Sequence, residues 1–286
     1  MYLGYLFGAN SYSANNSYVP LSLTTVIITG STAIGNYAFY NCTSIENITL
    51  PDSVSSVGNY TFYGCTALTC ITVGSGNTAY KTINGNLYSY DGTELIQYAV
   101  GKTDTSFIIP DGVSTINDYA FYGCYALTDI TIADSVTNIA GYAFYGCTAL
   151  SCITVGSGNT AYKSVDGNLY SYDGTTLIIY AVGNTDTSFI IPDDVTSISS
   201  YAFYNCNLLT TVTIGNKVTS VGINAFSNCS SLTAVYYYGT AEEWNNIKIG
   251  SGNNNLTSAT IYYYSEETPA ESGSYWHYVE GVATPW

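Results

Sequence analysis

The sequence contains no arginine, one histidine, one methionine and six prolines among 286 residues. Only 9% of the residues are charged, and 5 Lys+Arg against 20 Asp+Glu give a formal net charge of −15. So few cations exclude a protein that binds the phosphate backbone of nucleic acids. No apolar run of about 18 residues occurs, so we expect no membrane-spanning helix. The single histidine, His277, leaves little of the usual acid–base machinery of enzymes.

The sequence is rich in apolar residues (47%), with 31 tyrosines and eight cysteines. Such a chain can bury a core, which excludes a disordered protein. The cysteines reveal an internal repeat, because adding 82 to the numbers of the first five gives the numbers of the last five. Within it, Cys42 and Cys65 are 23 residues apart, and the other 59 residues divide into units of 23 and 36. These cysteines are Cys42, Cys65, Cys70, Cys124, Cys147, Cys152, Cys206 and Cys229.

Each unit carries the pattern of one coil of a solenoid. In residues 127–132, apolar residues alternate with Thr131, which predicts a short strand with one wet face. A polar turn follows, and Ala143, Phe144 and Cys147 then recur at helix-like spacing. Units of about 20–29 residues with a strand and a helical turn are typical of leucine-rich repeats, in which stacked units share a core.

We therefore expect a β-rich leucine-rich-repeat solenoid, a right-handed superhelix of about ten coils with short helical turns. Two inserted β-hairpins, around Asp91-Gly92 and Asp173-Gly174, should project from the spiral or pad it. Their strands are predicted at 86–90 with 93–100, and at 168–172 with 175–182. The ten strands of the coils are predicted at 23–28, 45–50, 68–73, 106–109, 127–132, 150–155, 188–191, 208–214, 232–237 and 256–262.

Several segments resemble a known family. The runs at 34–42, 109–113 and 119–124, and the Gly-Asn-Leu-Tyr-Ser-Tyr-Asp-Gly inserts at 85–92 and 167–174, resemble BspA-type leucine-rich repeats. The resemblance covers roughly residues 21 to 264. It implies a bacterial surface or secreted protein, adhesin-like in some relatives, and it carries over neither a ligand nor a catalytic set.

The two ends differ from the repeats. Residues 1–20 form an N-terminal segment, and Met1–Phe7 lacks the pattern of a signal peptide, so we expect an exported form to be a piece of a longer precursor. A C-terminal cap is predicted at about 239–264, where Thr240 and Glu243 match a capping box and Trp244 and Ile247 should cover the core. Residues 265–274 have linker composition. The aromatic tail 275–286 is interpreted as the start of another domain, a docked strap or a sticky tail.

The cysteines allow two interpretations. Six of them, Cys42 and its equivalents, share one phase of the repeat, and we favour stacked buried thiols over a metal or redox ladder. Cys70 and Cys152 fall on strands at a position that tolerates polar residues. A Cys65–Cys70 or Cys147–Cys152 disulfide is an alternative, although such thiols usually point apart.

Two surfaces are candidates for binding. Tyrosines at 37, 60, 119, 142 and 201, and at 40, 63, 122, 145 and 204, form either an aromatic platform or a stacking ladder, and we favour the ladder. The concave strand face forms either a binding stripe or merely a well-formed sheet. The candidate stripe consists of Ile27, Thr49, Thr72, Ile108, Thr131, Thr154, Ile190, Thr213, Tyr236 and Thr260, with Tyr237 and Tyr238 beside it.

Catalysis is not expected. The carboxylates recur with the turns, as at Asp52, Asp111, Asp134 and Asp193, whereas an acid–base pair needs one unique place. Calcium at these turns is the alternative; otherwise we expect no metal and no cofactor.

We therefore expect a monomeric, non-catalytic surface or secreted module that binds an extracellular protein or glycan. The alternatives are a spacer that positions other domains, or an accessory module of a carbohydrate-active enzyme.

Overall fold

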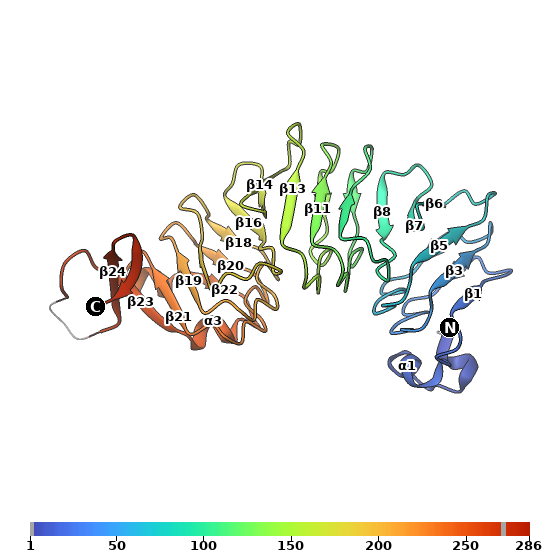
Figure 1. The fold of residues 1–286 in the computed structure, drawn as a ribbon, viewed down its shortest axis with the longest axis horizontal. Helices are drawn as coiled ribbons and strands as arrows, with labels where there is room; N and C mark the ends of the chain where they lie inside the picture. Colours follow the sequence, from blue (N-terminus) through green and yellow to red (C-terminus); the bar gives the residue numbers. More distant parts are fainter. Residues whose placement is uncertain (1–2, 270–272) are drawn as a thin grey trace. The chain divides into compact units, whose positions relative to one another are not determined.

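The computed structural model describes residues 3–269 and 273–286, and the fold is a β-solenoid of about ten coils (Figure 1). Two compact units divide the chain: Met1–Leu150 with Gly156–Asn159, and Ser151–Val155 with Thr160–Trp286. The first two residues of the expected N-terminal segment, and residues 270–272 of the expected linker, lie outside the described residues. No described helix is long and apolar enough to cross a membrane.

The N-terminal unit begins with three short helical turns and continues as a stack of strands. The turns are η1 (Leu3–Phe7), η2 (Tyr12–Ala14) and α1 (Asn15–Tyr18). The strands are β1 (Thr25–Ile27), β2 (Ala33–Ile34), β3 (Asn47–Leu50), β4 (Ser56–Val57), β5 (Cys70–Val73), β6 (Tyr80–Ile83), β7 (Asn86–Ser89), β8 (Glu94–Gln97), β9 (Ser106–Ile108), β10 (Thr115–Ile116), β11 (Asp129–Ile132) and β12 (Asn138–Ile139).

The C-terminal unit repeats this order and adds two short helices and a final hairpin. Its strands are β13 (Cys152–Val155), β14 (Tyr162–Val165), β15 (Asn168–Ser171), β16 (Thr176–Ile179), β17 (Ser188–Ile190), β18 (Ser197–Ile198), β19 (Thr211–Ile214), β20 (Ser220–Val221), β21 (Ala234–Tyr237), β22 (Lys248–Ile249), β23 (Thr260–Tyr264), β24 (Tyr275–Val279) and β25 (Val282–Pro285). The helices are α2 (Ala241–Asn245) and α3 (Asn254–Ser258).

All ten coil strands predicted from the sequence are confirmed, as β1, β3, β5, β9, β11, β13, β17, β19, β21 and β23. Neighbouring strands are parallel and keep the 23-residue register, so that Asn47 pairs with Cys70 and Thr49 with Thr72. Most strands begin two residues later than predicted, because the apolar residue before each, such as Leu68, is already buried below the sheet. The last prediction was wrong at its start, since Leu256 lies in α3.

A second row of parallel strands was not predicted. The strands β2, β4, β10, β12, β18, β20 and β22 have two residues each. Each pairs in parallel with a strand of a neighbouring coil, as Thr115 pairs with Asn138. Two residues cannot show alternation, so this row gives almost no signal in the sequence.

The predicted hairpins are confirmed around Asp91-Gly92 and Asp173-Gly174, but each is part of a three-stranded meander with β6 or β14. The meanders pad the solenoid, because Leu87 and Tyr88 are 0% and 1% exposed. The first also closes an edge: Thr82 Oγ1 donates to the Ile71 carbonyl (2.9 Å) and accepts from the Val73 N–H (2.9 Å). Sheet β1-β3-β5 therefore ends at β5.

The expected helical turns are instead hydrogen-bonded turns with left-handed residues. Tyr60 has φ 57° and Gly64 has φ 73°, and these two bracket the segment that was expected to be helical. An α-helix cannot pass through a left-handed residue, so the helix-like spacing of Ala143, Phe144 and Cys147 reflects a compact turn.

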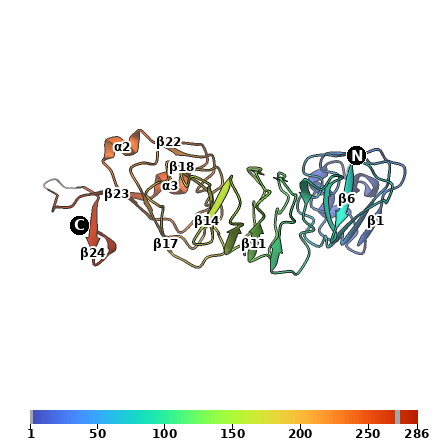
Figure 2. The ribbon, with the colours of Figure 1, turned by 90° about the horizontal axis from the view of Figure 1, so that it is seen from above.

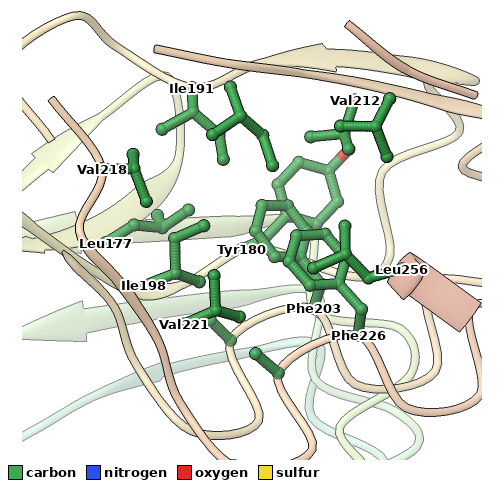
Figure 3. Packing of buried hydrophobic residues seen from close by; sticks show 14 of the residues in the cluster. Leu177, Tyr180, Ile191, Ile198, Phe203, Val212, Val218, Val221, Phe226 and Leu256 are labelled. Carbon is green, nitrogen blue, oxygen red and sulfur yellow. The ribbon is translucent and has the colours of Figure 1, made fainter. Parts of the chain in front are cut away.

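Each unit contains a cluster of buried apolar side chains that extends over several coils. In the C-terminal unit, Tyr180, Phe203 and Phe226 stack with centroids 5.1 and 4.5 Å apart, among aliphatic side chains (Figure 3). In the N-terminal unit, one core cluster extends from Val19 to Ala99.

The C-terminal cap is confirmed. Thr240 Oγ1 accepts from the Glu243 N–H (3.2 Å), and Glu243 Oε2 accepts from the Thr240 N–H (2.8 Å), which is the predicted capping box. Trp244 and Ile247 are buried in the core cluster. The aromatic tail docks: β24 pairs in parallel with β23 and antiparallel with β25, at the end of the unit (Figure 2).

Candidate binding surfaces

The residues of the candidate stripe belong to three different sheets. In the N-terminal unit Thr49 and Thr72 lie on sheet β1-β3-β5, whereas Ile108 and Thr131 pair on β9 and β11, because the first insert closes the edge of β5. In the C-terminal unit β17, β19, β21 and β23 carry the next four members. Apart from Asp129 on β11, the outward positions of these strands are uncharged, and Ile108 is 69% exposed.

Two of the predicted surface residues are buried. Tyr237 is 1% exposed, because the strand alternates and places Tyr236 and Tyr238 outside; its ring packs against Trp244 (5.3 Å). Thr213 is 4% exposed, since the larger Ile190 and Tyr236 flank it in the register. Neither prediction of an exposed residue was right.

The outer face of the C-terminal sheet ends in a cluster of aromatic side chains, which we name the aromatic surface. Its centre is Trp276, whose ring centroid lies 5.4 Å from that of Tyr236, 4.8 Å from Tyr238, 5.1 Å from Tyr264 and 5.2 Å from Tyr278. The aromatic surface consists of Tyr236, Tyr238, Tyr262, Tyr264, Trp276 and Tyr278.

Trp276 is the anchor of the docked tail. The side chain is 0% exposed, and its Nε1–H donates to the Tyr237 carbonyl (3.0 Å). The Tyr238 hydroxyl also donates to the Tyr278 hydroxyl. Burial, together with that bond, raises the pKa of Tyr238, so its hydroxyl stays protonated at physiological pH. Tyr264 and Tyr278 remain 36% and 38% exposed.

Part of the aromatic surface could be predicted from the sequence. Tyr236 and Tyr238 stand next to each other in the repeat pattern, but the tail that supplies Trp276 and Tyr278 lies about 40 residues later. No periodicity connects the tail to the strand, so its contribution follows only from the docking.

The tyrosine turns form the predicted ladder. Tyr37 stacks on Tyr60 (5.0 Å, 2° between planes) and Tyr40 stacks on Tyr63 (4.8 Å, 2°). Tyr12, from outside the repeats, stacks on Tyr37 (4.1 Å). Such stacking offsets the strain of holding Tyr37 and Tyr60 at positive φ.

The thiols are packing groups. Six cysteines are buried, Cys70 and Cys152 are half-buried, and all eight are free. Cys65 Sγ donates to the Phe39 carbonyl (3.0 Å) inside the core, whereas Cys70 Sγ contacts Thr72 Oγ1 (3.6 Å) on the outer face. The two thiols point apart, so the alternative of a Cys65–Cys70 disulfide is not realised. Burial raises the pKa of Cys42 to about 12, which keeps that thiol protonated.

The turn carboxylates bind neighbouring coils. Asp52 Oδ1 accepts from the Gly76 N–H (2.9 Å), and Asp134 Oδ1 accepts from the Gly158 N–H (3.0 Å). Among residues 3–269 and 273–286, no group of three or more His, Cys, Asp or Glu could hold a metal ion.

The comparisons agree with this fold. The family described as "BspA type Leucine rich repeat region" matches six copies, over residues 13–98, 97–173 and 180–267. No curated protein matches the chain. Among solved structures, a leucine-rich repeat protein of Eubacterium ventriosum is similar, with 22% identity and a TM-score of 0.55, over 90% of this chain and 71% of that one.

A second solved structure, the pneumococcal vaccine antigen PcpA, has 21% identity and a TM-score of 0.48, over 85% of this chain and 55% of that chain. Identities this low show the fold alone. The match of the family model spans most of the sequence, and leucine-rich repeats of this kind generally serve as non-catalytic binding modules of bacterial surface or secreted proteins. The chain belongs to the BspA-type leucine-rich-repeat family.

Proposed function

We propose that the protein is a non-catalytic binding module, secreted or at the bacterial cell surface, that holds an extracellular protein or glycan on the outward face of its strands. The aromatic surface carries this proposal. Rigid aromatic rings provide contact area at low entropic cost, and they dominate the energetics of many interfaces.

The composition of the C-terminal sheet supports a binding role. Beside the aromatic surface, Ile190 is 55% exposed on the same outer face, and no lysine lies on strands β17, β19, β21 or β23. Exposed apolar groups beside neutral tyrosines are typical of a surface that is covered when a partner binds.

The test is a screen of the purified chain against host-protein and glycan arrays, followed by affinity measurements on each hit. Tyr264→Lys and Ile190→Lys place a charge on the proposed face at exposed positions, so the fold should tolerate them. Each should weaken binding at least tenfold. Tyr125→Lys is the matched control, because Tyr125 is 56% exposed in the N-terminal unit.

Thr131→Lys and Thr154→Lys test whether the strand face outside the aromatic surface also binds the partner. A partner that spans them will lose affinity, with an unchanged melting temperature. If nothing binds at micromolar concentration, the protein is a spacer that positions other domains. If a partner binds and every lysine variant on the strand face binds normally, the proposed face is wrong.

A further inference from the structure

The N-terminal unit contains a cavity of about 300 Å³ between the tyrosine turns of two coils. Its walls include Tyr60 and Tyr119, and its apolar floor includes Val57, Ile96 and Ala140. This volume is at the lower end of the range of small-molecule sites in proteins, about 300–1,000 Å³.

The cavity exists because one coil lacks a tyrosine turn. In the 36-residue coil Tyr98 takes the place of the buried Phe, because its N–H donates to the Ala120 carbonyl (2.8 Å) and its ring stacks on Phe121 (5.3 Å). Ile96 and Gln97 therefore stand where the neighbouring coils have Tyr-Thr or Tyr-Ala. The turns on either side meet above the gap: Tyr119 OH donates to Tyr60 OH (3.2 Å), and Tyr63 stacks on Tyr122 (3.7 Å). The tyrosine side chains therefore cover the space that a turn of the 36-residue coil would otherwise fill.

The missing turn leaves a backbone donor without an acceptor. In other tyrosine turns the N–H of the phenylalanine donates to a carbonyl of the next coil. Phe39 N–H donates to the Thr61 carbonyl (2.9 Å), and Phe121 N–H donates to the Ala143 carbonyl (2.9 Å). Phe62 lines the cavity and is only 4% exposed, and its N–H has no hydrogen-bond partner among the described residues. Native proteins rarely leave such a buried donor unpaired.

The largely buried side chain of Gln97 lines the same space. Gln97 is 6% exposed, and its Nε2 donates to the Tyr98 carbonyl (2.8 Å) and the Ala120 carbonyl (3.2 Å). These two bonds fix the amide, while Oε1 has no partner among residues 3–269 and 273–286. Asn117 and Asp118 add further polar groups to the wall.

A comparison of the two copies of the repeat shows which of the lining residues the fold needs. Residues 64–124 are repeated, with 13 differences in 61 positions, at 146–206, and five residues of the first copy line the cavity: Ile96, Gln97, Asn117, Asp118 and Tyr119. The second copy keeps Ile178 and Tyr201 at the corresponding positions, but has Ile179, Ser199 and Ser200 in place of the three polar residues. The fold therefore does not require Gln97, Asn117 or Asp118.

We propose that this cavity binds one neutral sugar ring, free or at the end of a glycan. A pyranose presents an apolar face to aromatic rings and hydroxyls that both donate and accept. Phe62 N–H would donate to a ring substituent, Gln97 Oε1 and the Asp118 carboxylate would accept hydroxyl protons, and Tyr60 or Tyr119 would cover the C–H face. The Asp118 carboxylate and the net charge of −15 disfavour an anion.

The test titrates the ¹⁵N-labelled chain with the methyl glycosides of glucose, galactose, mannose and N-acetylglucosamine, up to tens of millimolar. At least one glycoside should shift the Phe62 backbone amide and the Gln97 side-chain amide. It should also slow hydrogen exchange at Phe62, toward the rates of Phe39 and Phe121. This readout needs no variant.

Gln97→Ile and Asp118→Ser copy the second repeat and should fold, as thermal melting will check. Each should weaken the sugar at least tenfold. Lys102→Asn, another difference between the copies that lies outside the cavity, is the matched control and should bind as the wild type does. No shift at Phe62 with any of the four glycosides would overturn the proposal, as would shifts that both cavity variants leave unchanged. The aromatic surface lies in the other unit, so neither result bears on it.

Discussion

Replacing Trp276 by alanine should release the C-terminal hairpin β24–β25 and leave the solenoid folded. The indole is 0% exposed, contacts four tyrosines and donates to the Tyr237 carbonyl. Burial of a side chain this size removes about 200 Å² from water, worth about 5 kcal/mol at about 25 cal/mol per Å². Measured losses for such truncations, about 3–5 kcal/mol, agree with that figure.

This loss of free energy exceeds the stabilisation that the remaining contacts give to the docked hairpin. Among the residues that the structure describes, two ladder pairs connect β24 to β23, Tyr263 with Tyr275 and Tyr264 with Trp276, and a two-stranded hairpin alone is marginally stable in water. Trp276→Phe keeps a ring but loses the hydrogen bond, so it should cost about 2 kcal/mol and leave the hairpin partly docked.

Hydrogen exchange measured by mass spectrometry distinguishes these outcomes. In the alanine variant, the amides of β24 and β25 should exchange at rates of an unfolded peptide, while those of β19 and β21 keep their protection. The phenylalanine variant should be intermediate. If the hairpin amides stay protected in the alanine variant, Trp276 is not the anchor; if β19 also loses protection, the tail is part of the global folding unit.

Three further predictions follow from burial, ionisation and capping. Burial raises the pKa of Tyr88 and of Tyr170 to about 12, so the folded state keeps phenol protons that the unfolded state loses above pH 10. The free energy of unfolding should therefore be at its full value below pH 10 and fall by about 1 kcal/mol for each tyrosine at pH 11. Urea unfolding at pH 8 and pH 11 measures this difference. In the native protein a thiol reagent should modify Cys70 and Cys152 and spare the six buried cysteines, and rapid modification of all eight would contradict the packing described. Thr240→Ala removes the cap of α2 and should destabilise the C-terminal unit by about 1 kcal/mol, whereas Thr240→Ser should be nearly neutral in thermal melting.

The sequence predicted the parts of the fold that repeat or that have local signatures. Alternation around Thr131 located a strand, Asp91-Gly92 located a hairpin, and Thr240 with Glu243 located a cap. In each, the physical cause lies within a few residues, so one stretch of sequence is enough to show it.

The parts that failed depend on contacts between distant residues. The closing of β5 by Thr82 follows from how the insert folds back, and the docking of Trp276 depends on strand β21, almost forty residues earlier. Tyr60 at positive φ is stabilised by rings in neighbouring coils, so its own sequence favours the wrong conformation. Tyr237 is different: strict alternation already placed it inside, and it should not have been counted with the surface.

The closed edge at β5 has a mechanical consequence for the N-terminal unit. A load that peels β1 away breaks backbone pairs with β3 and then with β5, where the ladder stops because side-chain bonds from Thr82 take over. The core cluster from Val19 to Ala99 ends in the same coil. In a stack held by nearest neighbours, such a boundary arrests unzipping. The meander β6–β8 is therefore expected to stop mechanical unfolding that starts at the N-terminus. Pulling on the N-terminal coils should extend the chain in one step that ends near residue 99, before the later coils unfold.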